Sequence, residues 1–144
     1  MILVDTTILV YAVGTDHGLR RPSRALLEGV RDGRLRACTT VEVAQEFTHV
    51  RSRRGSRVEA AARAREYALG LSPLVRPDED DLSDGLRIFE AAVNLGPFDA
   101  VLAAVALRRR WALASADRSF GAVDGLRHLD PSSSSFLAEL DAAG

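Results

Sequence analysis

Residues 2–10 read Ile2-Leu3-Val4-Asp5-Thr6-Thr7-Ile8-Leu9-Val10. Three apolar residues are followed by a carboxylate and two hydroxyls, and then by apolar residues again. This pattern predicts a short buried strand over residues 2–4 that passes directly into a helix from about Thr6 to Val13. Asp5 therefore stands at the carboxyl end of a strand and at the start of a helix.

The rest of the chain alternates between strand and helix patterns. Further strands are predicted at residues 35–38, 74–75, 111–114 and 126–129, and helices at about 22–30, 40–53, 58–69, 78–94 and 98–110, with a short turn or helix at 117–122. Such alternation predicts a three-layer α/β/α fold with a mostly parallel central sheet of about five strands. We expect one domain over residues 1–130, followed by a C-terminal tail over residues 131–144.

Composition and charge narrow the class of protein. The chain has 144 residues, of which 47% are hydrophobic and 27% charged, and this suits one folded domain. Cys38 is the single cysteine, and the sequence shows no leader pattern and no long apolar run, so we expect a cytoplasmic protein without membrane contact. The net charge of -1 gives no overall attraction to nucleic acid.

Four acidic residues are expected at one edge of the predicted sheet. Ligands of parallel sheets bind beyond the carboxyl ends of the strands. Asp5 and Asp117 follow predicted strands, Asp99 lies in the first turn of a helix, and Glu46 lies on the helix after the second strand. Each acid alone could be a helix cap or a surface residue. Together they would repel one another and raise their pKa values, which favours a divalent cation, and oxygen ligands without histidine or cysteine indicate Mg²⁺ or Mn²⁺.

A second glutamate, Glu42, lies four residues before Glu46 on the same predicted helix. Val43, Phe47 and Val50 define the buried stripe of this helix. Glu46 falls roughly 65° from the centre of the stripe and Glu42 roughly 105° from it. This geometry predicts that Glu46 borders the core while Glu42 leans towards solvent, and it favours Glu46 as the ligand.

Four segments resemble motifs of PIN-domain nucleases of the VapC toxin type, in the family's order and over residues 1 to about 130. Residues 2–12 resemble the opening strand and Asp-Thr motif, residues 43–50 the glutamate helix, residues 98–104 the third acidic motif and residues 114–120 the fourth. Two positions depart from the usual pattern. Thr7 stands where asparagine or serine is more common, and Ser119 stands where some relatives have another acid.

The resemblance implies a magnesium-dependent endoribonuclease that acts as the toxin of a type II VapBC toxin-antitoxin pair. It further implies a homodimer, a VapB-type antitoxin as partner, and RNA cleavage that leaves a 5′-phosphate and a 3′-hydroxyl with one or two Mg²⁺ or Mn²⁺ ions. Asp5 and Asp99 would be the primary metal ligands, and Glu46 and Asp117 would complete the catalytic cluster directly or through water. Thr6 and Ser115 would orient these ligands without contacting the metal themselves.

Other charged residues and other functions remain open on the sequence alone. Arg51, Arg53, Arg54 and Arg57 crowd the end of the glutamate helix, where they could bind an RNA backbone or simply be solvated. The three histidines, His17, His49 and His128, have no spacing that predicts a role. The alternative functions are a catalytically silent PIN-fold module that binds proteins and a DNA-directed PIN-like nuclease. The presence of all four acids argues against the first, and the short chain argues against the second.

Overall fold

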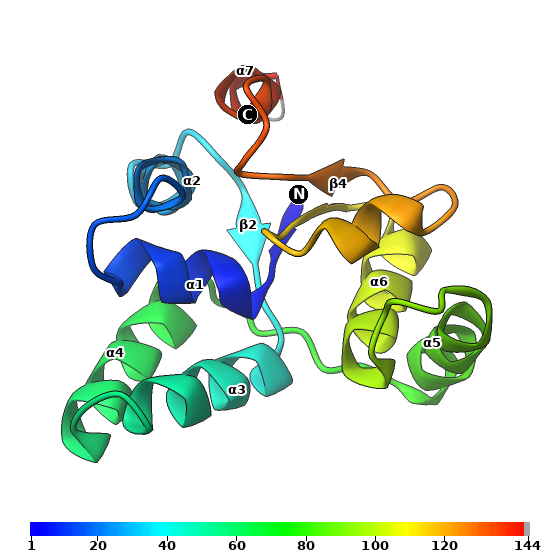
Figure 1. The fold of residues 1–144 in the computed structure, drawn as a ribbon, viewed down its shortest axis with the longest axis horizontal. Coiled ribbons are helices and arrows are strands. Elements are labelled where there is room, and N and C mark those ends of the chain that lie inside the picture. Colours follow the sequence, from blue (N-terminus) through cyan, green and yellow to red (C-terminus); the bar gives the residue numbers. More distant parts are fainter. Residues whose placement is uncertain (143–144) are drawn as a thin grey trace.

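A computed structural model describes residues 1–142 and confirms the α/β fold class (Figure 1). The strands of this part of the chain are β1 (Ile2–Val4), β2 (Ala37–Cys38), β3 (Ala112–Ala114) and β4 (His128–Leu129), which pair in parallel in the order β2-β1-β3-β4. The helices are α1 (Thr6–Val13), α2 (Arg20–Arg31), α3 (Val41–Ser52), α4 (Arg57–Gly70), α5 (Glu79–Ala91), α6 (Pro97–Arg109) and α7 (Phe136–Asp141), with a 3-10 helix η1 (Arg118–Ala122). Figure 1 shows α1, α3 and α4 on one side of the strands and α5 and α6 on the other.

The central strand β1 sets the position of the carboxyl edge of the sheet. All three of its residues are buried, as expected for a strand with helices over both faces. Ile2 pairs with Ala37 of β2 and with Ala112 of β3. The Asp5 backbone N–H then donates to the Ala114 carbonyl oxygen at 3.0 Å, so the β1–β3 ladder continues to the first turn of α1. Segments more than 100 residues apart are thereby brought side by side at this edge.

Side chains and proline fix where the helices near this edge begin. Asp5 caps α1, Thr40 caps α3 through the Val43 N–H, and Asp117 caps η1. Helix α6 begins at Pro97 after Gly96, and this start places Asp99 in its first turn. No helix within residues 1–142 is both long enough and apolar enough to cross a bilayer.

The strand predicted at residues 74–75 is reduced to one bridge, between Thr40 and Val75. Within residues 1–142 the sheet therefore has four strands rather than about five. Val75 still donates to the Thr39 carbonyl oxygen at 2.8 Å. Pairing extends no further because Pro73 and Pro77, on either side, lack the N–H that a ladder needs.

The segment after Pro131, expected to be a tail, contains α7. Phe136 and Leu140 of this helix are only 1% and 3% exposed and belong to the hydrophobic core. Their spacing of four residues places both on one face, which packs beside α2 (Figure 1). The last two residues of the expected tail, 143–144, lie outside the described residues.

Close packing between α5 and α6 holds the helix that carries Asp99. A Cβ atom added at Gly85 of α5 would lie 2.7 Å from the Val101 Cα of α6. Buried Asp81 of α5 accepts hydrogen bonds from both terminal nitrogens of Arg109 of α6, at 2.8 and 3.0 Å. The position of α6 is therefore set by backbone contact as well as by a two-pronged ion pair.

Replacing Gly85 with alanine tests this contact. Alanine is the better helix former by about 1 kcal/mol, yet we expect Gly85→Ala to lower the free energy of unfolding by about 1–3 kcal/mol through overpacking. Gly70→Ala is the matched control, because Gly70 ends α4 with no atom within 4 Å of its added Cβ. Urea denaturation of both variants decides the matter, and equal effects would contradict tight α5–α6 packing.

Candidate functional site

The four acids predicted from sequence line one pocket at the carboxyl edge of the sheet. This acid pocket has a volume of about 340 Å³ and is lined by Asp5, Thr6, Thr7, Val10, Tyr11, Glu46, Val50, Arg54, Asp99 and Asp117. The acids come from the starts of α1, α6 and η1 and from the middle of α3. The fold thus brings together all four residues that the sequence singled out.

Asp5 is buried, with 3% of its surface exposed, and its Oδ2 atom accepts three hydrogen bonds. The Ser115 hydroxyl donates at 2.7 Å, the Thr7 hydroxyl at 2.6 Å and the Thr7 backbone N–H at 3.2 Å. A carboxylate can be buried as an anion when donors of this kind replace its water. Ser115, predicted to orient an acid, does contact Asp5.

Thr7 has a positioning role that sequence reasoning missed. Its hydroxyl donates to Asp5 and accepts from the Ala116 N–H at 2.9 Å, while the Ser115 hydroxyl accepts from the Asp117 N–H at 3.0 Å. These contacts join the start of α1 to the loop that carries Asp117. The hydroxyl at position 7 was the available signal, because it keeps a donor where the family more often has asparagine or serine.

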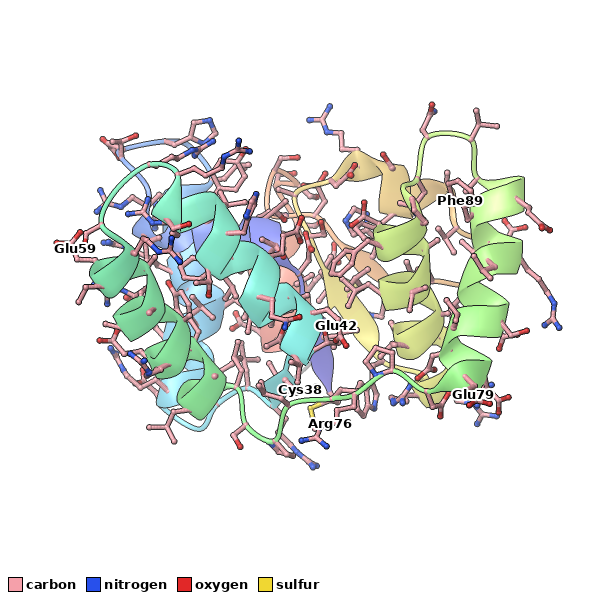
Figure 2. The ribbon with its side chains drawn as sticks, turned by 90° about the horizontal axis from the view of Figure 1, so that it is seen from below. Cys38, Glu42, Glu59, Arg76, Glu79 and Phe89 are labelled. Carbon is pink, nitrogen blue, oxygen red and sulfur yellow. The ribbon has the colours of Figure 1, made fainter. Side chains whose placement is uncertain are left out.

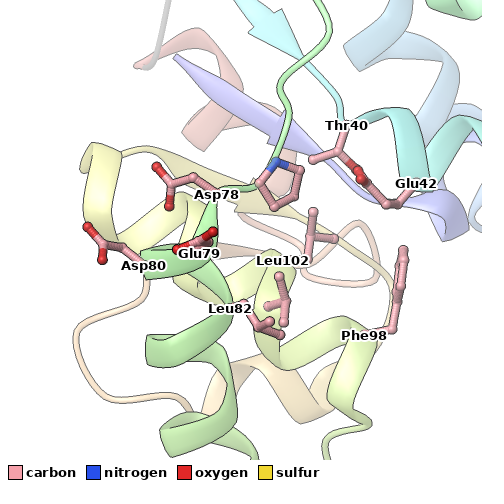
Figure 3. A pocket seen from close by; sticks show the side chains of 10 residues that line it. Thr40, Glu42, Asp78, Glu79, Asp80, Leu82, Phe98 and Leu102 are labelled. Atoms are coloured by element: carbon pink, nitrogen blue, oxygen red, sulfur yellow. The ribbon is translucent and has the colours of Figure 1, made fainter.

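Glu46 is joined to α1 through Thr6, whose hydroxyl donates to the glutamate Oε2 atom at 2.6 Å. Glu42 instead lines a second pocket of about 850 Å³ that also contains Asp78, Glu79 and Phe98 (Figure 3). Figure 2 shows Glu42 on the side of α3 that faces α6. The structure therefore places Glu46, and not Glu42, beside the other acids.

The burial expected for these two glutamates was wrong. Glu46 is exposed, whereas Glu42 is partly buried and its Oε2 atom is fully so. The angle from the apolar stripe measures distance from the core, but the acid pocket opens to solvent at the carboxyl edge. A residue can therefore point into the pocket and still be exposed.

Negative charge is concentrated around Asp99. Burial, followed by the charges of Asp5, Asp117 and Glu46, raises the pKa of Asp99 from 3.8 to about 6. Within residues 1–142, no three acidic, histidine or cysteine side chains lie close enough together to hold one metal ion as they stand. The donor set is nevertheless all carboxylate, which is the chemistry that hard divalent cations prefer.

The four arginines near the end of α3 occupy different places. Arg54 lines the acid pocket. Arg51 lines a separate pocket with Glu59. Arg53 is exposed just after α3, and Arg57 is exposed at the start of α4. Of this group, the fold brings Arg54 to the acids.

Comparison with known proteins agrees with the fold. The sequence profile of the PIN domain matches residues 2–126. Ribonuclease VapC7 of Mycobacterium tuberculosis (strain ATCC 25618 / H37Rv) is 43% identical over 97% of this chain and 98% of its own length. Ribonuclease VapC13 of the same strain is 33% identical over 90% of this chain and 99% of its own length. VapC ribonuclease Mb1869c of Mycobacterium bovis (strain ATCC BAA-935 / AF2122/97) is also 33% identical, over the same shares. The PIN profile and the match to VapC7 both cover most of the chain. The chain therefore belongs to the PIN-domain family and to the VapC type within it.

Proposed function

We propose that this protein is a magnesium-dependent endoribonuclease that acts in the cytoplasm as the toxin of a type II VapBC pair. The observation that carries the proposal is the set of four carboxylates around one pocket, drawn from four separate segments. The relatives are named as VapC ribonucleases, which supports RNA as the substrate. A VapB-type antitoxin and a homodimer are proposed on the same family grounds.

The acid pocket fits a divalent cation by its chemistry. Its donors are carboxylate oxygens, and the raised pKa of Asp99 reflects burial and mutual repulsion that a cation would relieve. We assign Asp5 and Asp99 as primary ligands of Mg²⁺ or Mn²⁺, with Glu46 and Asp117 completing the site directly or through water. When bound, the cation would supply positive charge at the phosphodiester and lower the pKa of an attacking water.

The remaining polar residues position these acids. Thr7 and Ser115 donate hydrogen bonds to Oδ2 of Asp5, so we assign the other carboxylate oxygen of Asp5 to the cation. Thr6 fixes Glu46 through the hydrogen bond to Oε2. Water, rather than a side chain, would form the new bond to phosphorus while the bond to the 3′-oxygen breaks. The leaving oxygen takes up a proton, and the products are a 3′-hydroxyl and a 5′-phosphate.

Arg54 is our main candidate among the α3–α4 arginines for contact with the RNA backbone. It lines the acid pocket, where a guanidinium group can hold a phosphate by two hydrogen bonds. Arg51 lies in the last turn of α3, Arg53 follows that helix and Arg57 begins α4. These three would act through general electrostatic attraction.

RNA cleavage should require Mg²⁺ or Mn²⁺. We expect purified protein to cut single-stranded RNA with either ion and to stop in EDTA, whereas Ca²⁺ should support binding with little turnover because its coordination is larger and looser. Gel analysis of labelled RNA, with matched single-stranded DNA alongside, measures this. Undiminished cleavage in excess EDTA would rule out the metal mechanism, and preferential cleavage of DNA would favour a DNA-directed nuclease.

Asp99→Asn should abolish cleavage and still stabilise the metal-free fold. Because the folded pKa of Asp99 is raised to about 6, its contribution to stability is present below pH 4 and is lost as pH rises through 6. After allowance for solvent screening, we expect the variant to gain about 1–2 kcal/mol at pH 7.5 and much less at pH 4. Urea denaturation in EDTA at the two pH values measures this, and a large loss of stability would mark Asp99 as structural.

Glu46→Gln and Glu42→Gln form a matched pair on one helix. We expect Glu46→Gln to lower the cleavage rate at least tenfold at limiting magnesium, and Glu42→Gln to stay within about threefold, since disturbing a ligand costs far more than changing its neighbour. A magnesium titration of both variants provides the measurement. The reverse ranking would show that α3 presents a different glutamate to the cation.

A further inference from the structure

Another polar pocket, apart from those described above, lies on the loop between α1 and α2 and on the first turns of α2. This arginine pocket has a volume of about 780 Å³ and is lined by Asp16, His17, Gly18, Arg20, Arg21, Arg24, Ala25 and Glu28. Its volume is within the usual range of ligand sites. Three arginines outnumber two acids in its lining, so the pocket favours an anion.

The guanidinium groups of this pocket form no ion pairs within residues 1–142. Arg24 uses its Nε atom to donate to the Ala12 carbonyl oxygen at 2.9 Å. The Arg20 Nε atom is buried and has no hydrogen-bond partner in the described part of the chain. This atom is enclosed by protein, so the groups of Arg20 that are open to an anion are its two terminal nitrogens, which form no ion pair within residues 1–142.

An aromatic pair connects the arginine pocket to the acid pocket. Tyr11 lines the acid pocket and His17 lines the arginine pocket, and their rings stack with centroids 5.0 Å apart and planes 22° apart. The Leu19 N–H donates to the His17 Nδ1 atom at 3.2 Å and so orients the ring. Tyr11 lies six positions after Asp5, a rise of about 9 Å along α1. The two pockets therefore lie near opposite ends of α1 and are joined by this aromatic pair.

We propose that the arginine pocket is a subsite for a backbone phosphate of the RNA strand, remote from the bond that is cut. Arg20 and Arg21 would bind the phosphate, and the Tyr11–His17 pair would offer an aromatic surface to the base between the two pockets. Arginine forks on phosphates and bases stacked on aromatic rings are the usual contacts of single-stranded RNA. The inference rests on the proposed ribonuclease function and extends it. The RNA must then be single-stranded from the bond that is cut to the phosphate bound by the arginines.

Arg21 is the residue to change, because it is exposed and its replacement removes charge without disturbing the core. We expect Arg21→Gln to weaken binding of a fluorescent RNA of about 12 uridines at least fivefold at low salt, in Ca²⁺ to prevent turnover. The slope of log affinity against log salt should fall by about 0.7, the value for one phosphate contact on a single strand. Arg21→Glu should lose more affinity than Arg21→Gln.

Arg36→Gln is the matched control. Arg36 is also exposed but immediately precedes β2, at the amino edge of the sheet and away from both pockets. It should keep its affinity within about twofold and its salt slope unchanged, as expected for a surface charge outside the RNA path.

The outcomes separate the two inferences. If the wild type cuts RNA but both Arg21 variants bind like Arg36→Gln, the subsite is wrong and the proposed function stands; this result would also follow if the pocket served a protein partner. If the wild type neither binds nor cuts RNA, both inferences fall. Loss of affinity and salt slope in the Arg21 variants alone, with unchanged melting temperatures, supports the subsite.

Discussion

The burial of the Asp5 carboxylate is the constraint on which the site depends. Desolvating a carboxylate is costly unless hydrogen bonds replace its water, and within residues 1–142 the donors to it come from Thr7 and Ser115. Thr7 lies two residues after Asp5, whereas Ser115 directly follows β3, so the bond from Ser115 forms only when β1 and β3 pair in register. Sheet register, the start of α1 and the course of the loop to Asp117 are therefore coupled to one charged group.

Asp81 and Asp99 lie in different electrostatic surroundings, and their pKa values shift in opposite directions. Burial would raise the pKa of Asp81, but hydrogen bonds from Arg109 and from the Asp78 N–H, with the charges of both neighbouring arginines, lower it. Asp99 lies among acids instead, and its pKa is raised. The first acid holds α5 against α6, whereas the second is left in an unfavourable electrostatic setting. Such a setting is typical of functional sites, where stability is given up for ligand binding.

Charge along α1 is divided between its two ends. The acids gather at the amino end, and the arginines of the proposed subsite lie past the carboxyl end, with Tyr11 and His17 between them. The net charge of -1 is a sum over the whole chain and does not show this separation. In the proposed function, two phosphates of one RNA strand would lie at different ends of α1. The phosphate at the acids would be cut, and the phosphate at the arginines would only be bound. Local placement, rather than overall charge, would then direct the RNA strand.

The sequence by itself determined β1, α1, the alternation of strands and helices, and the family, because apolar periodicity and short motifs are local properties. It also selected the four acids now found around one pocket, since each follows a strand or begins or occupies a helix at the carboxyl edge. Only the tertiary structure decided that Val75 makes one bridge, that Phe136 and Leu140 enter the core, and that Thr7 joins the start of α1 to Ala116. It also decided that Glu46 reaches the acids while remaining exposed, and that His17 stacks on Tyr11. These features depend on contacts between residues distant in the chain or across a loop, and no local pattern records which neighbour a side chain will meet.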